Sequence, residues 1–181
     1  RHIRYKDVYE LKQVVKKEFN IEGYPSETFM KLIEDIKPAQ VTLVPDAPDV
    51  LTSNAGWDTV KFEKELTDII ARLKKVSRVS VFVEADSDMV RGAKKCGADR
   101  VELYTESYAA QYPNNPQQAI EKFITAANTA QEVGLGLNAG HDLSLENLRY
   151  FQENIPNLLE VSIGHALISD ALYYGLEKTI Q

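Results

Sequence analysis

The stretch GLGLNAGHDLSLENLRYFQENIPNLLEVSIGH, residues 134–165, repeats one pattern twice. Each copy begins with a short apolar run, passes through a small-residue turn that contains glycine, and ends in a histidine, at residues 138–141 and again at 162–165. A helix start is expected after each histidine. The pattern therefore predicts two strand-to-helix turns that form neighbouring corners of one active site. They hold two of the chain's three histidines.

The same alternation of strand and helix extends along the whole chain. Apolar residues at helical spacing predict helices, and short runs rich in β-branched residues predict strands. The expected strands are 19–22, 40–44, 78–83, 100–104, 135–137 and 158–161, several of them nearly continuous in apolar residues. The expected helices are 5–19, 26–37, 58–75, 87–95, 117–133, 143–153 and 166–179, and long loops are expected at 45–57 and 105–116.

Six strands that alternate with helices indicate an α/β protein built from parallel β-α units. An open doubly wound sheet and a closed (β/α)₈ TIM barrel both fit this order. No G-x-G-x-x-G follows any strand, which argues against a dinucleotide-binding fold. Polar residues gather at the carboxyl ends of the strands, where barrels place their chemistry: Glu22, Thr52, Glu84, Thr105, His141 and His165. We therefore expect one partial TIM-barrel domain over residues 1–181, with about six β-α units instead of the usual eight.

The composition excludes several classes of function. A net charge of −6 gives no reason to expect nucleic acid as a partner, and no apolar run is long enough to span a membrane. The single cysteine, Cys96, excludes an internal disulfide and a cysteine-rich metal site, and we expect it to be buried. These features predict a soluble protein of the cytoplasm.

Several segments, in their order along the chain, resemble the pyridoxine 5′-phosphate synthase family of vitamin B6 biosynthesis. They are HIRYKDV (2–8), NIE (20–22), VTLVP (41–45), LTSNAGWD (51–58), VELYTESYA (101–109), LNAGHDLSLENL (137–148) and VSIGHALISDAL (161–172). Members of this family are (β/α)₈ barrels that open with two further β-α units, so this sequence is similar to a member without that portion. The resemblance implies a transferase-type condensing enzyme. It joins 1-deoxy-D-xylulose 5-phosphate to 3-amino-2-oxopropyl phosphate and yields pyridoxine 5′-phosphate, phosphate and water.

The resemblance also implies roles for individual residues. Glu22 corresponds to a general base at the end of its strand, and His141 to the proton donor. Gly164 and His165 correspond to the pair that grips the phosphate of the amino ketone, where a helix N-terminus would offer free amides to an oxyanion.

Further substrate contacts implied by the resemblance are His2 and Thr52, toward the deoxyxylulose phosphate, and Asp142. Asp142 stands where some relatives have glycine, so only its backbone could serve the substrate. Tyr104 and Glu106 stand where histidine and glycine are frequent, and neither receives a role. The resemblance implies phosphorylated small molecules as substrates, neither a metal ion nor an organic cofactor, and a homo-oligomer, an octamer in the family.

Two other functions fit parts of the sequence. One is another phosphate-handling barrel enzyme of the aldolase or isomerase kind, although no strand-end lysine is available for a Schiff base. The other is a truncated, non-catalytic paralogue that binds phosphorylated metabolites. Because other family site residues fall outside the sequence, we expect little or no turnover from these 181 residues by themselves. An apolar stripe in the last helix, Leu172 to Leu176, fits either an interface or a core.

Overall fold

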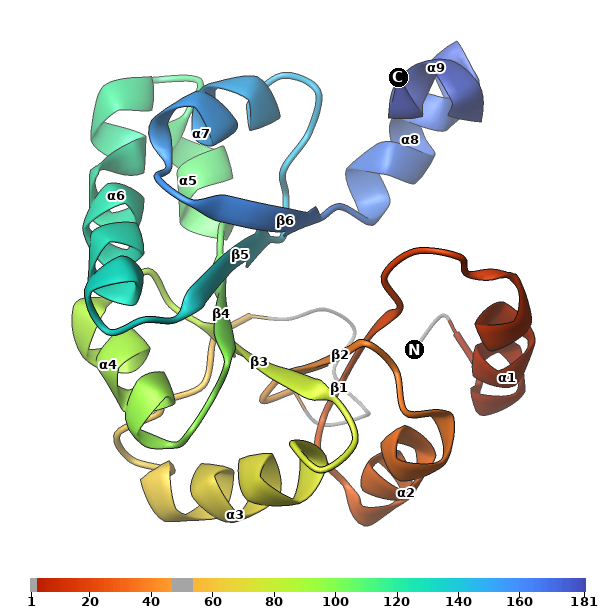
Figure 1. Cartoon of the computed structure of the whole chain (residues 1–181). Coiled ribbons are helices and arrows are strands. Elements are labelled where there is room, and N and C mark those ends of the chain that lie inside the picture. Colours follow the sequence, from red (N-terminus) through yellow and green to blue (C-terminus); the bar gives the residue numbers. More distant parts are fainter. Residues whose placement is uncertain (1–2, 47–53) are drawn as a thin grey trace.

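The computed structural model describes residues 3–46 and 54–181. The elements are α1 (Tyr5–Val14), β1 (Asn20–Gly23), α2 (Glu27–Ile36), β2 (Gln40–Leu43), α3 (Glu63–Leu73), β3 (Arg78–Val83), α4 (Ser87–Lys95), β4 (Arg100–Tyr104), α5 (Glu106–Gln111), α6 (Pro116–Glu132), β5 (Gly136–Gly140), α7 (Leu148–Asn154), β6 (Leu158–Ser162), α8 (His165–Tyr174) and α9 (Leu176–Ile180). Helices and strands alternate along this part of the chain, except that α6 follows α5 and α9 follows α8 directly (Figure 1).

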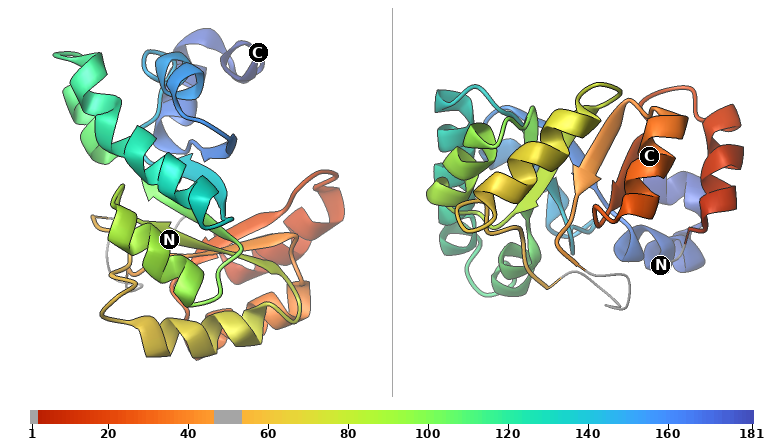
Figure 2. Two further views of the ribbon diagram at one scale, coloured as in Figure 1. Left: turned by 60° about the vertical axis from the view of Figure 1, so that its left-hand side comes forward. Right: turned by 90° about the horizontal axis from the view of Figure 1, so that it is seen from below.

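The six strands form one parallel sheet in the order β1-β2-β3-β4-β5-β6, so each β-α unit adds its strand beside the previous one. In a flat sheet, β1 and β6 would lie about 24 Å apart, at roughly 4.8 Å per strand. Instead, the Ser162 hydroxyl on β6 donates to Glu22 Oε1 on β1 over 3.0 Å. The sheet is therefore curled like part of a barrel, with helices outside it (Figures 1 and 2). This architecture confirms the predicted barrel-type fold with six β-α units.

The two faces of the curled sheet have opposite character. Residues that alternate along the strands point outward and form the core with the helices, including Val41, Leu43, Val79, Val81, Val101, Leu103, Leu137 and Ala139. The intervening positions face the concave side and are largely polar, including Gln40, Thr42, Ser80, Glu102 and Asn138. Strands β2 to β5 are nonetheless buried at almost every position, so both of their faces are covered, as the apolar runs predicted.

Charged side chains meet near the amino ends of the strands, inside the curl. The Glu160 carboxylate on β6 lies 3.0 Å from Arg100 Nη1 on β4 and accepts from Asn138 Nδ2 over 2.9 Å. It also accepts from Gln40 Nε2 on β2 over 3.3 Å. Arg78 on β3 pairs with Glu18, ahead of β1. The Glu160 carboxylate thus connects β6 to β5, β4 and β2 across the inside of the curl. These contacts stabilise the curvature of the sheet.

Helix capping fixes where several helices begin. The Ser26 hydroxyl accepts from the Phe29 amide at the start of α2, and the Asp86 carboxylate accepts from the Asp88 and Met89 amides at the start of α4. Asn115 caps α6 in the same way, by accepting from the Gln118 amide. These caps anchor the helices that cover the outer face of the sheet.

Some predicted boundaries were wrong. The expected loop 105–116 contains helix α5, because Tyr108 is fully buried and draws this turn onto α6. Helix α1 ends at Val14 instead of Phe19. Helix α3 starts at Glu63 instead of residue 58, because the Asp58 carboxylate accepts from the Lys61 amide and forms a turn first.

The predicted helices after the two histidines also differ. The predicted helix 143–153 begins only at Leu148, since Asn147 closes a turn by accepting from the Ser144 amide. The predicted final helix is broken in two at Gly175, which has φ +83°. Helices α8 and α9 pack chiefly on each other and project from the body of the molecule (Figures 1 and 2). The apolar stripe that includes Leu172 and Tyr173 is exposed, so it is not part of the core.

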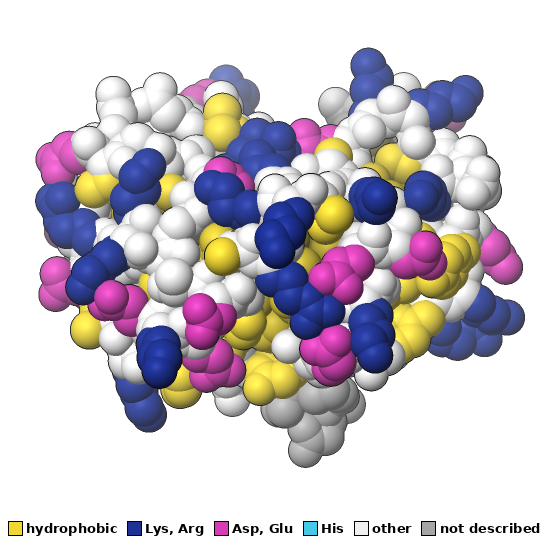
Figure 3. Space-filling model, turned by 60° about the horizontal axis from the view of Figure 1, so that its bottom comes forward, with side chains coloured by type: hydrophobic (Ala, Val, Ile, Leu, Met, Phe, Trp, Pro, Cys, Tyr) yellow, Lys and Arg dark blue, Asp and Glu magenta, His cyan; other side chains and the backbone are white. Residues whose placement is uncertain are grey.

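The outer surface carries charges of both signs. Figure 3 shows cationic and carboxylate side chains interspersed on the face seen from below. Ion pairs join neighbouring helices on the outside of the molecule, such as Arg72 with Glu27 at 2.8 Å and with Glu34 at 2.6 Å. Helices α2 and α3 are joined in this way on the outside of the molecule.

Candidate active site at the carboxyl ends of the strands

Glu22 lies on the concave face of β1, close to the carboxyl end of that strand. Glu22 is exposed to solvent, but neighbouring protein atoms partly desolvate its carboxylate. This desolvation raises the pKa of Glu22, and the hydrogen bond from Ser162 and the nearby His141 act in the opposite direction. A carboxylate with a raised pKa beside an imidazole is suited to proton transfer.

A second carboxylate, Glu102 on β4, lies next to Glu22. Glu102 is buried, and its Oε2 atom has no hydrogen-bond partner among the residues that the structure describes. Burial, and then the charge of Glu22, raise the pKa of Glu102 well above its usual range. Gly140 allows this packing, because a Cβ at that position would lie 2.2 Å from Glu102 Oε1. The result is a pair of carboxyl groups in which Glu102 favours the neutral form.

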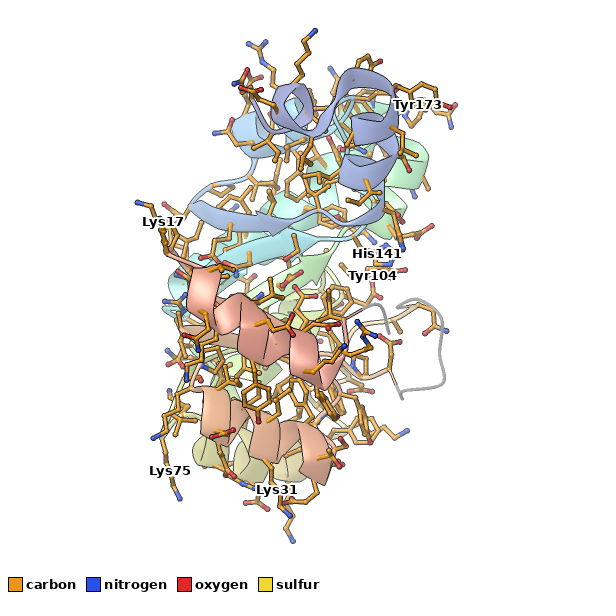
Figure 4. All side chains as sticks on the ribbon, turned by 90° about the vertical axis from the view of Figure 1, so that its right-hand side faces the viewer. Lys17, Lys31, Lys75, Tyr104, His141 and Tyr173 are labelled. Atoms are coloured by element: carbon orange, nitrogen blue, oxygen red, sulfur yellow. The ribbon has the colours of Figure 1, made fainter. Side chains whose placement is uncertain are left out.

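His141 follows β5 and is held through both its backbone and its ring. The Thr105 hydroxyl lies within hydrogen-bond distance of the carbonyl oxygens of Gly140, at 2.7 Å, and of His141. The Tyr104 ring lies edge-on against the imidazole, with ring centroids 4.8 Å apart, and Figure 4 shows the two side chains together on one side of the molecule. Burial, and then nearby carboxylates that include Glu106 and Asp142, raise the pKa of Tyr104, so its hydroxyl stays protonated.

The second histidine turn lies at the start of α8. Gly164 is the residue before the first turn of this helix, and His165 is its first residue. The first amides of a helix have no intrahelical acceptor and point toward the positive end of its dipole, which favours an anion. Both residues are exposed. Since Ser162 contacts Glu22 only two residues earlier, this helix start lies beside the carboxylates.

The structure therefore brings together Glu22, His141 and the chain segment that leads into Gly164 and His165. Asp142 lies in the same turn, but its carboxylate contacts His141 Nδ1 at 2.9 Å. His2 and Thr52 fall outside the described residues.

Sequence reasoning missed Glu102, Ser162 and Thr105 as parts of this site. The alternation within RVELY at residues 100–104 is the signal that could have found Glu102, because it puts a carboxylate on the polar face of a buried strand. Ser162 stood inside the quoted histidine turn, and Thr105 among the strand-end polar residues. Neither sequence position revealed which partner each hydroxyl would bind.

In residues 3–46 and 54–181, no group of three or more His, Cys, Asp or Glu side chains is placed to hold a metal ion. In the same ranges, no helix combines the length and apolar character needed to cross a membrane.

Comparison with known proteins identifies the family. The sequence profile described as "Pyridoxal phosphate biosynthesis protein PdxJ" matches residues 1–181. The pyridoxine 5′-phosphate synthase of Cytophaga hutchinsonii is 62% identical over 182 residues, which cover 100% of this chain and 76% of the relative. The chain belongs to the PdxJ family. The pyridoxine 5′-phosphate synthase of Bacteroides thetaiotaomicron is 59% identical, with 100% of this chain and 77% of that protein covered.

PdxJ membership confirms the family predicted from the sequence, and with it the prediction of an enzyme. Among solved structures, a dihydrodipicolinate synthase matches with a TM-score of 0.59 and 12% identity, over 90% of this chain and 61% of that one. At this level of identity the likeness concerns the fold alone. It agrees with the curled parallel sheet described above.

Proposed function

We propose that this chain acts as a pyridoxine 5′-phosphate synthase. The reaction condenses 1-deoxy-D-xylulose 5-phosphate with 3-amino-2-oxopropyl phosphate and releases phosphate and water. The main structural support for this proposal is that Glu22, Glu102 and His141 lie close together on the concave face, beside the start of α8. This arrangement supplies acid and base groups next to an anion-binding helix end, which ring closure between two phosphorylated substrates requires.

Glu22 is the general base in this proposal. Imine formation, enolisation, elimination and ring closure each move protons, and a base works best when its pKa lies near the working pH. Burial raises the pKa of Glu22 toward that range. Because Glu102 favours its neutral form, Glu22 can ionise without a second negative charge beside it. Glu102 thereby sets the charge state of the base.

His141 is the proton donor, and Gly164 with His165 binds the phosphate of the amino ketone. The imidazole lies near the Glu22 carboxylate, so one group can remove a proton while the other donates one. Amides at the start of α8 provide the phosphate with hydrogen bonds that remain available at any pH. The roles of His2 and Thr52 toward the deoxyxylulose phosphate, and of the Asp142 backbone toward substrate, stay predictions.

We also propose that the protein forms a homo-oligomer and works in the cytoplasm. Exposed apolar side chains on α8 and α9 support association between copies of the chain. A biosynthetic family and a single buried thiol, Cys96, support the cytoplasm.

Product formation tests the proposed function. The two substrates are incubated with the 181-residue chain, and separately with an extended form that joins it to the residues of the Cytophaga hutchinsonii relative outside the match. We expect pyridoxine 5′-phosphate, identified by its absorbance and mass, from the extended form. Its absence there would contradict the proposal. The 181-residue chain assayed by itself tests the expectation of little turnover.

A further inference from the structure

His141 and Asp142 adopt an unusual backbone conformation. Their φ angles are +87° and +59°, so two consecutive residues with side chains occupy the left-handed region that glycine accepts most easily. Strain of this kind persists where the surrounding structure imposes it, and it concentrates at functional sites. Aspartate is one of the few residues that tolerate this region. The conformation therefore points to a functional role for this turn.

The Asp142 carboxylate contacts the imidazole of its neighbour. Oδ2 of Asp142 lies 2.9 Å from Nδ1 of His141. An ionised carboxylate can only accept hydrogen bonds, so Nδ1 must carry the proton in this contact. When the ring is neutral, Nε2 is then its unprotonated nitrogen. When the ring is charged, Nε2 carries the second proton.

Surrounding groups hold this pair from the backbone side. Asn147 Nδ2 donates to the Asp142 carbonyl oxygen over 3.2 Å, and the Tyr108 hydroxyl donates to the Asn147 carbonyl oxygen over 2.7 Å. The Thr105 hydroxyl contacts the carbonyl oxygen of His141, while the Tyr104 ring packs against the imidazole (Figure 4). The carbonyl groups of both residues are thus anchored, and the ring is restrained by a carboxylate and an aromatic neighbour.

We propose that Asp142 is a positioning residue for His141: its carboxylate holds Nδ1–H and thereby presents Nε2 to the substrate. This inference rests on the proposed role of His141 as proton donor. A carboxylate on the second ring nitrogen fixes both the tautomer and the orientation of an acid–base histidine. It also explains how a negative side chain is accommodated in a site for phosphorylated substrates, since the carboxylate is engaged by the imidazole.

The direct test is the tautomer of His141. Histidine ¹⁵N shifts are measured by NMR in the 181-residue chain, with assignment by replacing each of the three histidines in turn. In the wild type we expect the neutral ring to carry its proton on Nδ1. Asp142→Gly should shift the population toward the Nε2-protonated form, whereas Asp142→Asn, which keeps an acceptor oxygen, should retain the wild-type form. An unchanged spectrum in Asp142→Gly would overturn the proposal.

Kinetics in the extended form provide the second test. We expect Asp142→Gly to lower kcat roughly tenfold, a part of what an acid–base group contributes, while KM changes little, and Asp142→Asn to recover part of the loss. Thermal unfolding should be unchanged or slightly higher in Asp142→Gly, because glycine accepts φ +59°. A shifted tautomer with unchanged kcat would also overturn the positioning role. Full activity of His141→Ala would instead remove the proposed proton donor, and the NMR result would still decide whether Asp142 sets the tautomer.

Discussion

At the scale of single residues, Glu102 links the site to the stability of the fold. It is almost completely buried, and its carboxyl group packs closely against Gly140. The negative charge of Glu22 further disfavours its ionised form. Burying a carboxylate is costly unless it is paired, so such a group keeps its proton. The site thus holds a neutral acid beside an ionisable base.

Glu102→Gln should flatten the dependence of stability on pH. The folded protein holds the Glu102 proton at a pH where the unfolded chain has released it, because the pKa is raised on folding. The stabilisation is therefore complete below the unfolded pKa and is lost as the pH rises through the folded pKa. Urea unfolding between about pH 5 and about pH 8 should show a larger fall in the free energy of unfolding for the wild type than for the variant. Equal slopes for the two proteins would contradict this assignment.

At the scale of elements, an aromatic cluster positions the turn that carries His141. Tyr108 of α5, Phe123 of α6 and Phe151 of α7 are fully buried, with ring centroids 4.9 Å apart for Tyr108 and Phe151 and 5.9 Å for Tyr108 and Phe123. The Tyr108 hydroxyl then reaches the backbone of Asn147. Packing between three helices thereby helps to fix the turn that carries His141.

Phe123→Ala should destabilise the fold by about 3–5 kcal/mol, the usual loss for removing a buried aromatic side chain. The control is Val14→Ala on α1, where 66% of the residue is exposed and the change should be within about 0.5 kcal/mol. Chemical unfolding of both variants measures the difference. Similar losses in the two variants would show that the cluster does not carry the expected packing energy.

Strand positions were predictable from the sequence because each strand is a short run bounded by turn residues. The runs at 40–44, 78–83 and 100–104 became β2, β3 and β4 almost unchanged. Helix starts were harder, since α3 and α7 are delayed by local turns at Asp58 and Asn147 that compete with the helix. Helix α5 forms only because Tyr108 finds a buried place among residues distant in sequence.

The site was predictable to the extent that its residues stand at strand ends. Glu22 and His141 are at the expected corners, and the second histidine turn begins α8 as expected. The neutral acid Glu102 could not be assigned from the sequence, because its protonation depends on burial and on the proximity of Glu22. The side-chain role of Asp142 depends equally on a turn geometry that no spacing rule predicts.

At the scale of the whole molecule, the concave face of the sheet and the projecting helices α8 and α9 have different surface character. Polar groups line the concave side, while α8 and α9 present exposed apolar side chains that include Ile168, Leu172 and Tyr173. Figure 4 shows Tyr173 at the periphery, away from His141. Several exposed apolar side chains on two adjoining helices favour contact with another protein surface.

We therefore predict self-association through α8 and α9. Sedimentation velocity should detect species larger than a monomer whose population increases with protein concentration. Leu172→Glu should shift the distribution toward monomer, because a carboxylate at a position that is 83% exposed remains solvated in the monomer but not in an apolar interface. A purely monomeric wild type, or a variant that associates equally, would contradict this prediction.

The central claim is that Glu22 and His141 carry proton transfer in pyridoxine 5′-phosphate synthesis. The most direct measurement compares product formation by the extended form, its Glu22→Gln and His141→Ala variants, and the control Glu121→Gln, which alters an exposed carboxylate on α6. We predict at least about a 10²-fold loss of kcat in the first two variants, with folding retained, and no loss in the control. Wild-type rates in Glu22→Gln or His141→Ala would contradict the claim.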